Sequence, residues 1–260
     1  MADELFELSL LGGAIERRYR KQRPEIDAID WRSLERAKFT PAQREAGRRF
    51  WTVNAYTEHA AAAGCSAVLR ALIEARAPLD LVAAESSFVL DEVAHTELSA
   101  RIANALGGGA AIRYDAAALV SDPPAELSPL GRAVDLAIGV HCISETFSLP
   151  LAREMVRHQP HAVMRTALRR IVKDEAAHAR LGWVILDWAD ELLDDDTRRR
   201  LRQRVGEAIA RRRARAYGTP VDDGGDTLGW LPSAQYAKLA PTVWEEEVCA
   251  PLRERGYLDA

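Results

Sequence analysis

The pattern Asp-Glu-x-x-His occurs twice in the sequence, at residues 91–95 and at residues 174–178. Each copy lies within a long stretch that contains no proline, and the residues that flank the two copies are similar, as in a repeated pair of helices. On an α-helix, residues three apart lie on one face with their Cβ atoms about 5–6 Å apart, so the Glu and the His of one copy can bind the same metal ion. A fold in which both copies bind metal must place them on two helices that face each other, at the same level along the helix axes.

Composition and the positions of helix-ending residues divide the chain into long predicted helices. Alanine, leucine, arginine and glutamate dominate, and alternation of β-branched residues is nearly absent, which predicts an all-α fold. Proline, glycine and capping residues mark the ends of the segments. The predicted long helices cover about residues 41–75, 79–106, 130–157 (with a kink at Pro150), 161–193, 197–217 and 233–255. A short amphipathic helix over residues 4–22, an irregular arm after it and a loop over residues 218–232 complete the prediction.

The lengths of the connections predict how these helices are arranged. The first and second long helices are joined by a few residues, as are the third and fourth, so each pair should form an antiparallel hairpin. The second and third are joined by about twenty residues, enough extended chain to run the length of a helix. A long crossover in the middle of four long helices is the topology of a ferritin-like four-helix bundle. We therefore expect one domain over residues 1–260, with its core at about 41–193, an N-terminal arm at 1–40 and C-terminal helices at 194–260.

The two core helices without the motif are expected to contribute one glutamate each. Two cations a few ångströms apart repel each other, so carboxylates must bridge them, and each remaining helix should supply a Glu at the same level. Glu58 on the first helix and Glu145 on the third meet this requirement, because a predicted turn separates each of them from its motif partner. The predicted metal-ligand and catalytic set is Glu58, Glu92, His95, Glu145, Glu175 and His178.

These motifs and their placement resemble the ferritin-like di-iron carboxylate proteins. That group includes bacterioferritin, rubrerythrin, the small subunit of ribonucleotide reductase, bacterial multicomponent monooxygenases, acyl-carrier-protein desaturase and p-aminobenzoate N-oxygenase. The resemblance covers about residues 41–193 and implies two iron ions, with Glu92 and Glu175 able to bridge them. The implied ligands are Glu58, Glu92 and His95 for one ion, and Glu145, Glu175 and His178 for the other.

The Asp that precedes each ligand Glu resembles the oxygen-activating branch of this group. The resemblance implies that Asp91 and Asp174 each orient a ligand histidine, and a metal-bound imidazole does need an acceptor for its other N–H. Mixed carboxylate and imidazole ligation favours iron or manganese over zinc, so manganese or a mixed Mn/Fe pair stays open.

Three further polar residues share a helix face with a predicted ligand. His141 lies one turn before Glu145 and is either an additional ligand, a hydrogen-bond donor to a ligand, or a packed core histidine. Glu85 lies two turns before the first motif and could replace or supplement Glu58. Asn54 lies one turn before Glu58 and could donate a hydrogen bond to it.

Small residues also lie near the predicted ligands, at 61–63, Cys65 and Gly182. They leave room for a small organic substrate, and close helix packing is the alternative explanation. Cys65, Cys142 and Cys249 form no Cys-x-x-Cys pair, which disfavours a rubrerythrin-type second iron site and predicts free thiols in a reducing compartment.

The charge balance and hydropathy exclude several classes. Lys and Arg total 35 and Asp and Glu total 39, for a net charge of −4, so a dedicated nucleic-acid binder is not expected. No apolar run approaches the roughly 18 residues of a membrane span. The acidic start of the sequence lacks the basic segment of a signal peptide, so we expect the cytoplasm.

The residues outside the predicted core favour an enzyme that covers a substrate pocket. The leading hypothesis is a non-haem di-iron oxidoreductase that activates O₂ to hydroxylate or N-oxygenate a small organic substrate. A ferroxidase or iron-storage protein and a non-catalytic metal-binding or scaffold protein are the alternatives. The expected partners are the substrate, O₂ and an electron-donor protein, for which the arginine runs at 198–200 and 211–213 offer a docking surface or only a solvated helix face. A homodimer is the expected oligomer.

Overall fold

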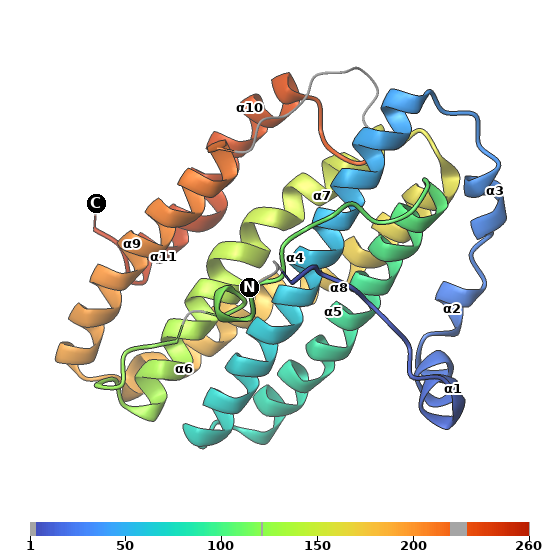
Figure 1. Cartoon of the computed structure of the whole chain (residues 1–260). Coiled ribbons are helices and arrows are strands. Elements are labelled where there is room, and N and C mark those ends of the chain that lie inside the picture. The colour runs from blue at the N-terminus through green and yellow to red at the C-terminus, as the bar shows by residue number, and fades with distance from the viewer. Residues whose placement is uncertain (1–3, 121, 219–227, 260) are drawn as a thin grey trace.

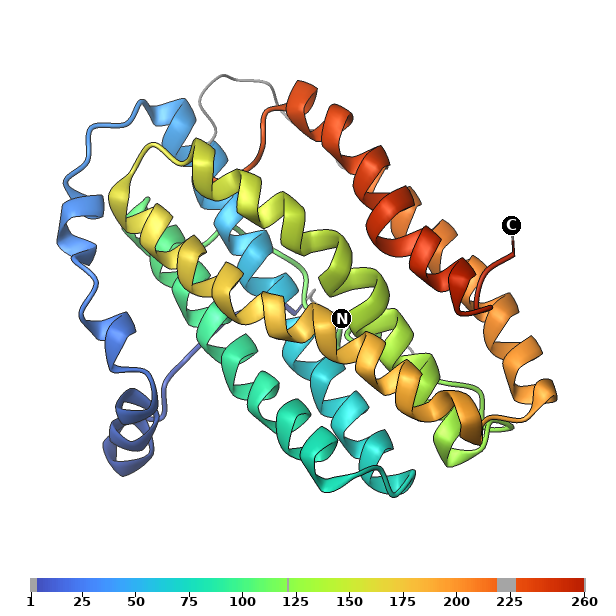
Figure 2. The same cartoon turned by 180° about the vertical axis from the view of Figure 1, so that it is seen from behind.

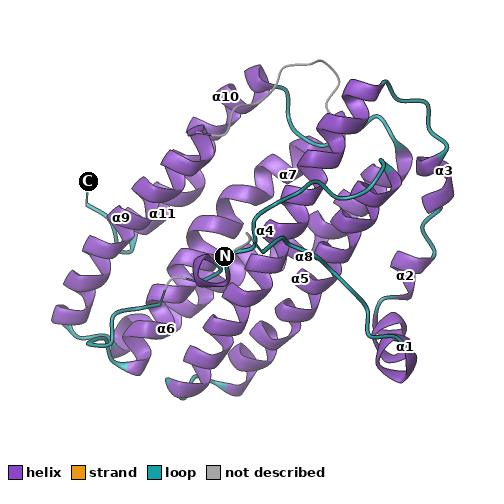
Figure 3. Cartoon of the chain, in the orientation of Figure 1, coloured by secondary structure: helices purple, strands orange, loops and turns teal. Residues whose placement is uncertain are grey.

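The computed structural model describes residues 4–120, 122–218 and 228–259. Within these ranges the chain is helical apart from loops and one isolated β-bridge between Leu5 and Arg113 (Figure 3). The prediction of an all-α fold is therefore confirmed.

Four long helical segments pack side by side and form the centre of the molecule (Figures 1 and 2). They are α4 (Pro41–Glu74), α5 (Leu79–Ala105), the continuous segment α6 (Pro129–Ala137), η2 (Ile138–Glu145) and α7 (Thr146–His158), and α8 (Ala162–Ala189). α4 and α5 form one antiparallel hairpin, and α7 and α8 form another. The chain between α5 and α6, which includes the short helix η1 (Ala116–Ala118), runs back along the length of these helices. As a result α5 and the α6–α7 segment point in the same direction.

Local signals explain why these helices begin and end where they do. Thr40 accepts a hydrogen bond from the backbone N–H of Gln43, whose side chain accepts in return from the backbone of Thr40, and Pro41 occupies the first turn. α4 ends just before Arg76, which has a φ of 56°. α5 ends before Gly107, whose φ of 123° is a conformation that glycine adopts at little cost.

The third long segment contains a π-helical stretch that the sequence did not predict. Residues Ile138–Glu145 adopt wider turns than an α-helix. The hydroxyls of Ser144 and Thr146 donate to the carbonyls of Gly139 and His141, five residues earlier, at 3.0 Å each. The π-helical stretch thus comprises the residues that precede and include Glu145, and Pro150 lies further along the chain, within α7.

The prediction of one helix over residues 4–22 is wrong in its first half. Helix α1 spans only Gly13–Gln22, because Gly12 and Gly13 have φ values of 85° and 65°, which an α-helix cannot continue. Residues 4–12 are extended and pair with the crossover: Phe6 N–H donates to Ile112 at 2.8 Å. This pairing is non-local, so the pattern of residues 4–22 alone does not reveal it. Short helices α2 (Pro24–Asp27) and α3 (Trp31–Glu35) follow.

The C-terminal helices pack on the α7 side of the molecule (Figure 2). After the short helix η3 (Asp190–Leu192) come α9 (Asp195–Gly218), α10 (Ser233–Thr242), the π-helical segment η4 (Val243–Cys249) and α11 (Ala250–Glu254). Trp244 stacks on Phe147 with ring centroids 4.2 Å apart, and Arg204 makes a paired contact with Asp135 at 2.6 and 2.8 Å. Most of the loop predicted at 218–232, residues 219–227, lies outside the described residues.

The buried polar residues lie between two clusters of buried apolar side chains. Along α4, Trp51 and Cys65 belong to different clusters and Glu58 lies between them. Along α5, Phe88 and Leu98 flank the first Asp-Glu-x-x-His motif in the same way. All three cysteines are free and buried, as predicted. The apolar clusters therefore hold a charged layer in the interior, and that layer contains the predicted ligands.

Candidate metal centre

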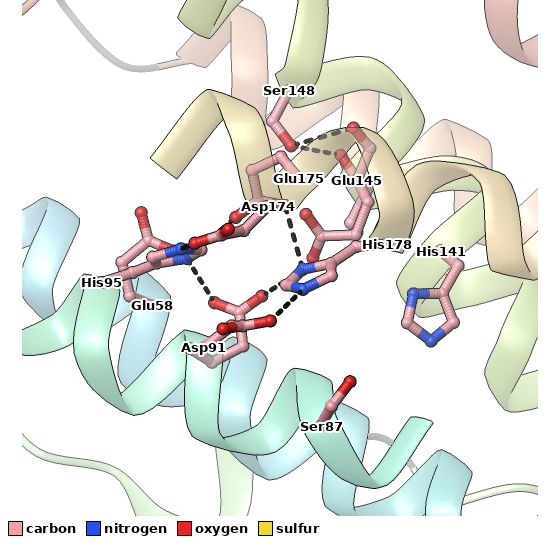
Figure 4. A network of polar contacts seen from close by, with 12 residues as sticks. Glu58, Ser87, Asp91, His95, His141, Glu145, Ser148, Asp174, Glu175 and His178 are labelled. Carbon is pink, nitrogen blue, oxygen red and sulfur yellow. Dashed lines mark hydrogen bonds and ion pairs between the residues drawn. The ribbon is translucent and has the colours of Figure 1, made fainter. Parts of the chain in front are cut away.

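The six predicted ligands converge in this layer, one or two from each of the four long segments (Figure 4). They form two overlapping groups in which one donor atom from each residue lies within 4.8 Å of the others. The groups are Glu58, Glu92, His95 and Glu175, and Glu92, Glu145, Glu175 and His178. Glu92 and Glu175, the two glutamates expected to bridge, are the residues that both groups share. Five of the six side chains are buried, and Glu58 is 14% exposed.

Both histidines present Nδ1 to the shared carboxylates. Nδ1 of His95 lies 3.0 Å from Glu175 Oε1 and 3.5 Å from Glu92 Oε2. Nδ1 of His178 lies 2.9 Å from Glu92 Oε1 and 3.3 Å from Glu175 Oε2. Each shared carboxylate therefore has one oxygen toward each histidine, which is the arrangement that two ions bridged by two carboxylates require.

The outer nitrogen of each histidine faces an aspartate from the other motif. His95 Nε2 hydrogen-bonds Asp174 Oδ2 at 3.0 Å, and His178 Nε2 lies 3.5 Å from Asp91 Oδ2. An acceptor at Nε2 holds the proton there and leaves Nδ1 as the nitrogen that faces the cluster. The two predicted aspartates thus lie where they can orient the imidazoles, each across the interface between α5 and α8.

Arg170 connects the two aspartates and was missed by the sequence analysis. Its guanidinium forms an ion pair with Asp174 and lies 3.5 Å from Asp91 Oδ1. It also contacts Glu25 of α2 at 3.2 Å, which ties the N-terminal arm to the site. Arg170 precedes Asp174 by one helical turn, and that spacing is the signal that could have identified it.

A separate pair of polar side chains supports Glu58. As expected, the Asn54 amide donates to Glu58 Oε1 at 2.9 Å, and the same nitrogen donates to Ser99 Oγ at 2.9 Å. These contacts fix one oxygen of the most exposed predicted ligand.

The carboxylates divide into two electrostatic types. Burial raises the pKa of Glu58 and Glu145 well above the usual value, and the charge of neighbouring glutamates raises both pKa values further. Burial also opposes ionisation of Glu175, but its close contacts with His178 and His95 outweigh burial and lower its pKa. The shared carboxylate Glu175 is therefore charged in the metal-free protein, while the outer ones tend to keep a proton.

The histidines hold positive charge in the same cluster. Burial alone would lower both pKa values. Close contacts with the carboxylates of Asp91, Glu175 and Glu92 instead raise the pKa of His178 to about 12. Contacts with Glu175 and Glu92 raise the pKa of His95 well above its usual value. In the metal-free protein the imidazolium groups thus offset the carboxylate charge that cations would otherwise offset.

The buried polar atoms of the six predicted ligands indicate whether these residues fit a pair of metal ions. Both oxygens of Glu92, Oε2 of Glu175, Nδ1 of His95 and both ring nitrogens of His178 are buried without a hydrogen bond of good geometry, although the nitrogens lie 2.9–3.5 Å from carboxylate oxygens. Buried polar atoms without well-formed hydrogen bonds are costly, and cations held between the carboxylates and the Nδ1 atoms would offset that cost. The donor set, four carboxylates and two imidazoles, suits two divalent transition ions.

Glu85 and His141 lie together but outside the two groups. His141 Nε2 hydrogen-bonds Glu85 Oε2 at 2.9 Å, and Figure 4 shows His141 beside the network, next to His178. Glu58 occupies the position for which Glu85 was the alternative. The ring of Phe88 lies 4.0 Å from that of His178 and 6.0 Å from that of His141, measured between centroids.

A cleft of about 250 Å³ is lined by residues of α7, α8 and η4 and by none of the six predicted ligands. Its lining includes Thr146 and Ala179, which directly follow Glu145 and His178, and Glu247 from η4. The small residues 61–63 do not line this cleft.

Three of the six arginines in the two runs form ion pairs within α9. Arg199 and Arg200 contact Asp196 at 2.9 and 2.8 Å, and Arg211 contacts Glu207 at 3.5 Å. Arg198 pairs with Asp190 of η3, and Arg213 donates to Cys249 of η4. The solvated helix face and the docking surface both stay predictions.

Compared with known families, curated proteins and solved structures, the chain matches no family model, no curated protein and no solved structure. Among the described residues, no helix has both the length and the apolar character needed to cross a membrane.

Proposed function

We propose that this chain is a ferritin-like di-iron oxidoreductase that uses O₂ to hydroxylate or N-oxygenate a small organic substrate. The observation that carries the proposal is the sharing of Glu92 and Glu175 by two groups of donors, each completed by a histidine. A structural site for a single ion has no need of two overlapping groups, and the burial of four carboxylates carries a desolvation cost that bound cations would offset.

When bound, an iron pair would supply the redox chemistry for O₂, with electrons from an external donor. The chain's own residues hold that pair and control its surroundings. Glu92 and Glu175 contact both histidines, so they can set the separation of two ions. Asp91 and Asp174 keep a proton on the outer nitrogen of each imidazole. The side chains of Glu92, His95 and His178 are 0% exposed, so bulk water has little access to the centre.

The cleft between α7, α8 and η4 favours an oxygenase over an iron-storage protein. Its lining includes Thr146 and Ala179, which follow Glu145 and His178 in sequence, and Glu247 of η4, which lies outside the four long segments. A C-terminal addition that helps to line a cleft is expected of an enzyme that holds an organic substrate.

Aerobic titration with Fe(II) tests the proposal. We expect uptake to stop near two iron atoms per chain, with O₂ consumed in proportion. Uptake of many iron atoms per chain with mineral formation would identify a storage protein. Purification without metal, together with an unchanged melting temperature on addition of Fe(II), would identify a scaffold. The control variant Glu74→Ala should take up iron as the wild-type protein does, because Glu74 pairs with Arg70 on the outer face of α4 and is not among the predicted ligands.

A further inference from the structure

A second set of metal-binding side chains lies in the interior, apart from the six described above. Cys65 of α4, Glu85 of α5 and His141 of η2 each offer one donor atom, and these atoms lie within 4.8 Å of one another. All three residues are 0% exposed. Three different donor types from three separate segments therefore converge on one point that solvent does not reach.

Two polar atoms of this group have no partner. Glu85 and His141 hydrogen-bond each other through Oε2 and Nε2, which leaves Glu85 Oε1 and His141 Nδ1 buried without a hydrogen bond. Such atoms are costly in a protein interior, and a bound ligand is one of the few ways to satisfy them. A cation held by the carboxylate, the imidazole and the sulfur would do so.

The backbone is shaped to bring His141 into this position. A Cβ atom on Gly182 of α8 would lie 2.6 Å from His141 Cβ and 3.0 Å from the backbone nitrogen of Cys142. A Cβ atom on Gly64 of α4 would lie 3.2 Å from Val140. Glycines on both neighbouring helices thus let the π-helical segment approach closely at the residues that carry the imidazole.

We propose that Cys65, Glu85 and His141 form a mononuclear metal site that binds one thiolate-preferring divalent cation, of which Zn²⁺ is the best fit. Thiolate, imidazole and carboxylate are the three donor types that zinc takes in proteins, and three protein ligands leave a fourth position for water or another small ligand. One thiolate and one carboxylate neutralise a dication. The centre described above contains no sulfur, so the two sites select different metals by ligand softness.

The chemistry of Cys65 supports a metal over a nucleophile. Burial and the charge of Glu85 raise the pKa of the Cys65 thiol, so without a metal the sulfur keeps its proton. A buried, protonated thiol is a poor nucleophile, whereas a cation with high thiolate affinity can displace the proton. The ring of Phe88 contacts both His141 of this site and His178 of the carboxylate centre.

Co²⁺ added to the full-length, metal-depleted protein tests the proposal, because Co²⁺ bound to a thiolate absorbs in the near ultraviolet through charge transfer. We expect the wild-type protein to show this absorption at a stoichiometry of one per chain and Cys65→Ala to lose it. Cys142→Ala is the matched control: Cys142 is equally buried and adjacent to His141, but it lies outside the group, so the absorption should remain.

The wild-type spectrum alone can overturn the proposal. Absence of the charge-transfer band in folded wild-type protein, or its full retention in Cys65→Ala, contradicts the site. If Cys65→Ala does not fold, His141→Ala provides the second variant. A His141→Ala protein that binds Co²⁺ as tightly as the wild type, with the same absorption band, also contradicts the proposed site. Iron content separates the two proposals: a protein that shows the band but takes up no iron pair retains this site and loses the proposed function.

Discussion

Asp174 of α8 hydrogen-bonds His95 of α5 at 3.0 Å, although the two residues belong to different copies of the same motif. The reverse contact, between Asp91 and His178, measures 3.5 Å. Each motif therefore supplies a glutamate and a histidine to the centre and an aspartate to the histidine of the other copy. Because of this exchange, neither copy is complete on its own, and α5 and α8 must pack in a single register for the centre to form.

Replacing Asp174 with Asn tests this exchange. The amide can still contact His95 but carries no charge, so it holds the ring less firmly and makes Nδ1 a weaker ligand. We expect metal affinity to fall about 10- to 100-fold, with two metal ions still bound at saturation. Isothermal titration and metal analysis measure both quantities.

Asp187→Asn is the control for that variant, because Asp187 lies on the same helix and contacts Arg255 at the surface. Complete loss of metal in Asp174→Asn would show that Asp174 is itself a ligand. Unchanged affinity would show that it has no orienting role.

Arg170→Ala should weaken both aspartate contacts at once. Arg170 lies between Asp91 and Asp174 and also reaches Glu25, so its loss leaves two partly buried carboxylates without their shared cation. We expect lower metal affinity together with a lower melting temperature. The neighbouring Arg169→Ala, at an exposed position, should change neither, and equal effects of the two substitutions would contradict a role for Arg170 in the centre.

The pKa shifts predict opposite pH dependences for the metal-free protein and for metal binding. The pKa of His178 is raised to about 12, so in the metal-free fold this group contributes stability that is complete below its unfolded value of 6.5 and is lost as pH rises toward 12. Metal binding needs the neutral imidazole and releases its proton, so apparent metal affinity should rise with pH over the same window.

Thermal unfolding of chelator-treated protein between pH 7 and pH 9 measures the first effect, and titration in buffers of different ionisation enthalpy measures the second. We expect the melting temperature of the metal-free protein to fall with pH and protons to be released when metal binds. Metal binding without proton release would show that the histidines are not the ligands.

Gly182→Ala should destabilise the protein. The added Cβ would lie 2.6 Å from His141 Cβ, so α8 and η2 must separate, at a cost of about 1–3 kcal/mol. Gly206→Ala on α9 is the control, because a Cβ there has no atom within 4 Å and removes only glycine's flexibility, which should stabilise by about 0.5–1 kcal/mol. Chemical denaturation gives both free energies of unfolding. A neutral Gly182→Ala would show that the close approach is not required.

The predicted features that the structure reproduces are those set by short-range pattern. The bounds of α4 follow from the Thr40 cap and Pro41, and the pairing of Glu92 with His95 follows from helical spacing. The level of Glu58 could be inferred because one turn of known length joins α4 and α5. Connection lengths and periodicity were sufficient for these residues.

The features that escaped prediction depend on contacts between distant segments. The extended conformation of residues 4–12 depends on pairing with Ile112, and the assignment of Asp174 to His95 depends on how α5 and α8 pack. The π-helical segment η2 packs closely against Gly182, a contact between distant residues that no local pattern encodes. His141 lies one turn from Glu145 in sequence, yet its hydrogen bond is to Glu85. The spacing of residues along one helix therefore does not show which of two adjacent buried sites a side chain belongs to.

Anomalous scattering at the iron and manganese edges, from a crystal of protein loaded with Fe(II), tests the central claim most directly. We predict two peaks, one within each group of donors, with Glu92 and Glu175 next to both, and neither peak in Glu175→Ala or His178→Ala crystals that retain the fold. A single peak, peaks away from these six side chains, or two peaks that persist in both variants would contradict the account.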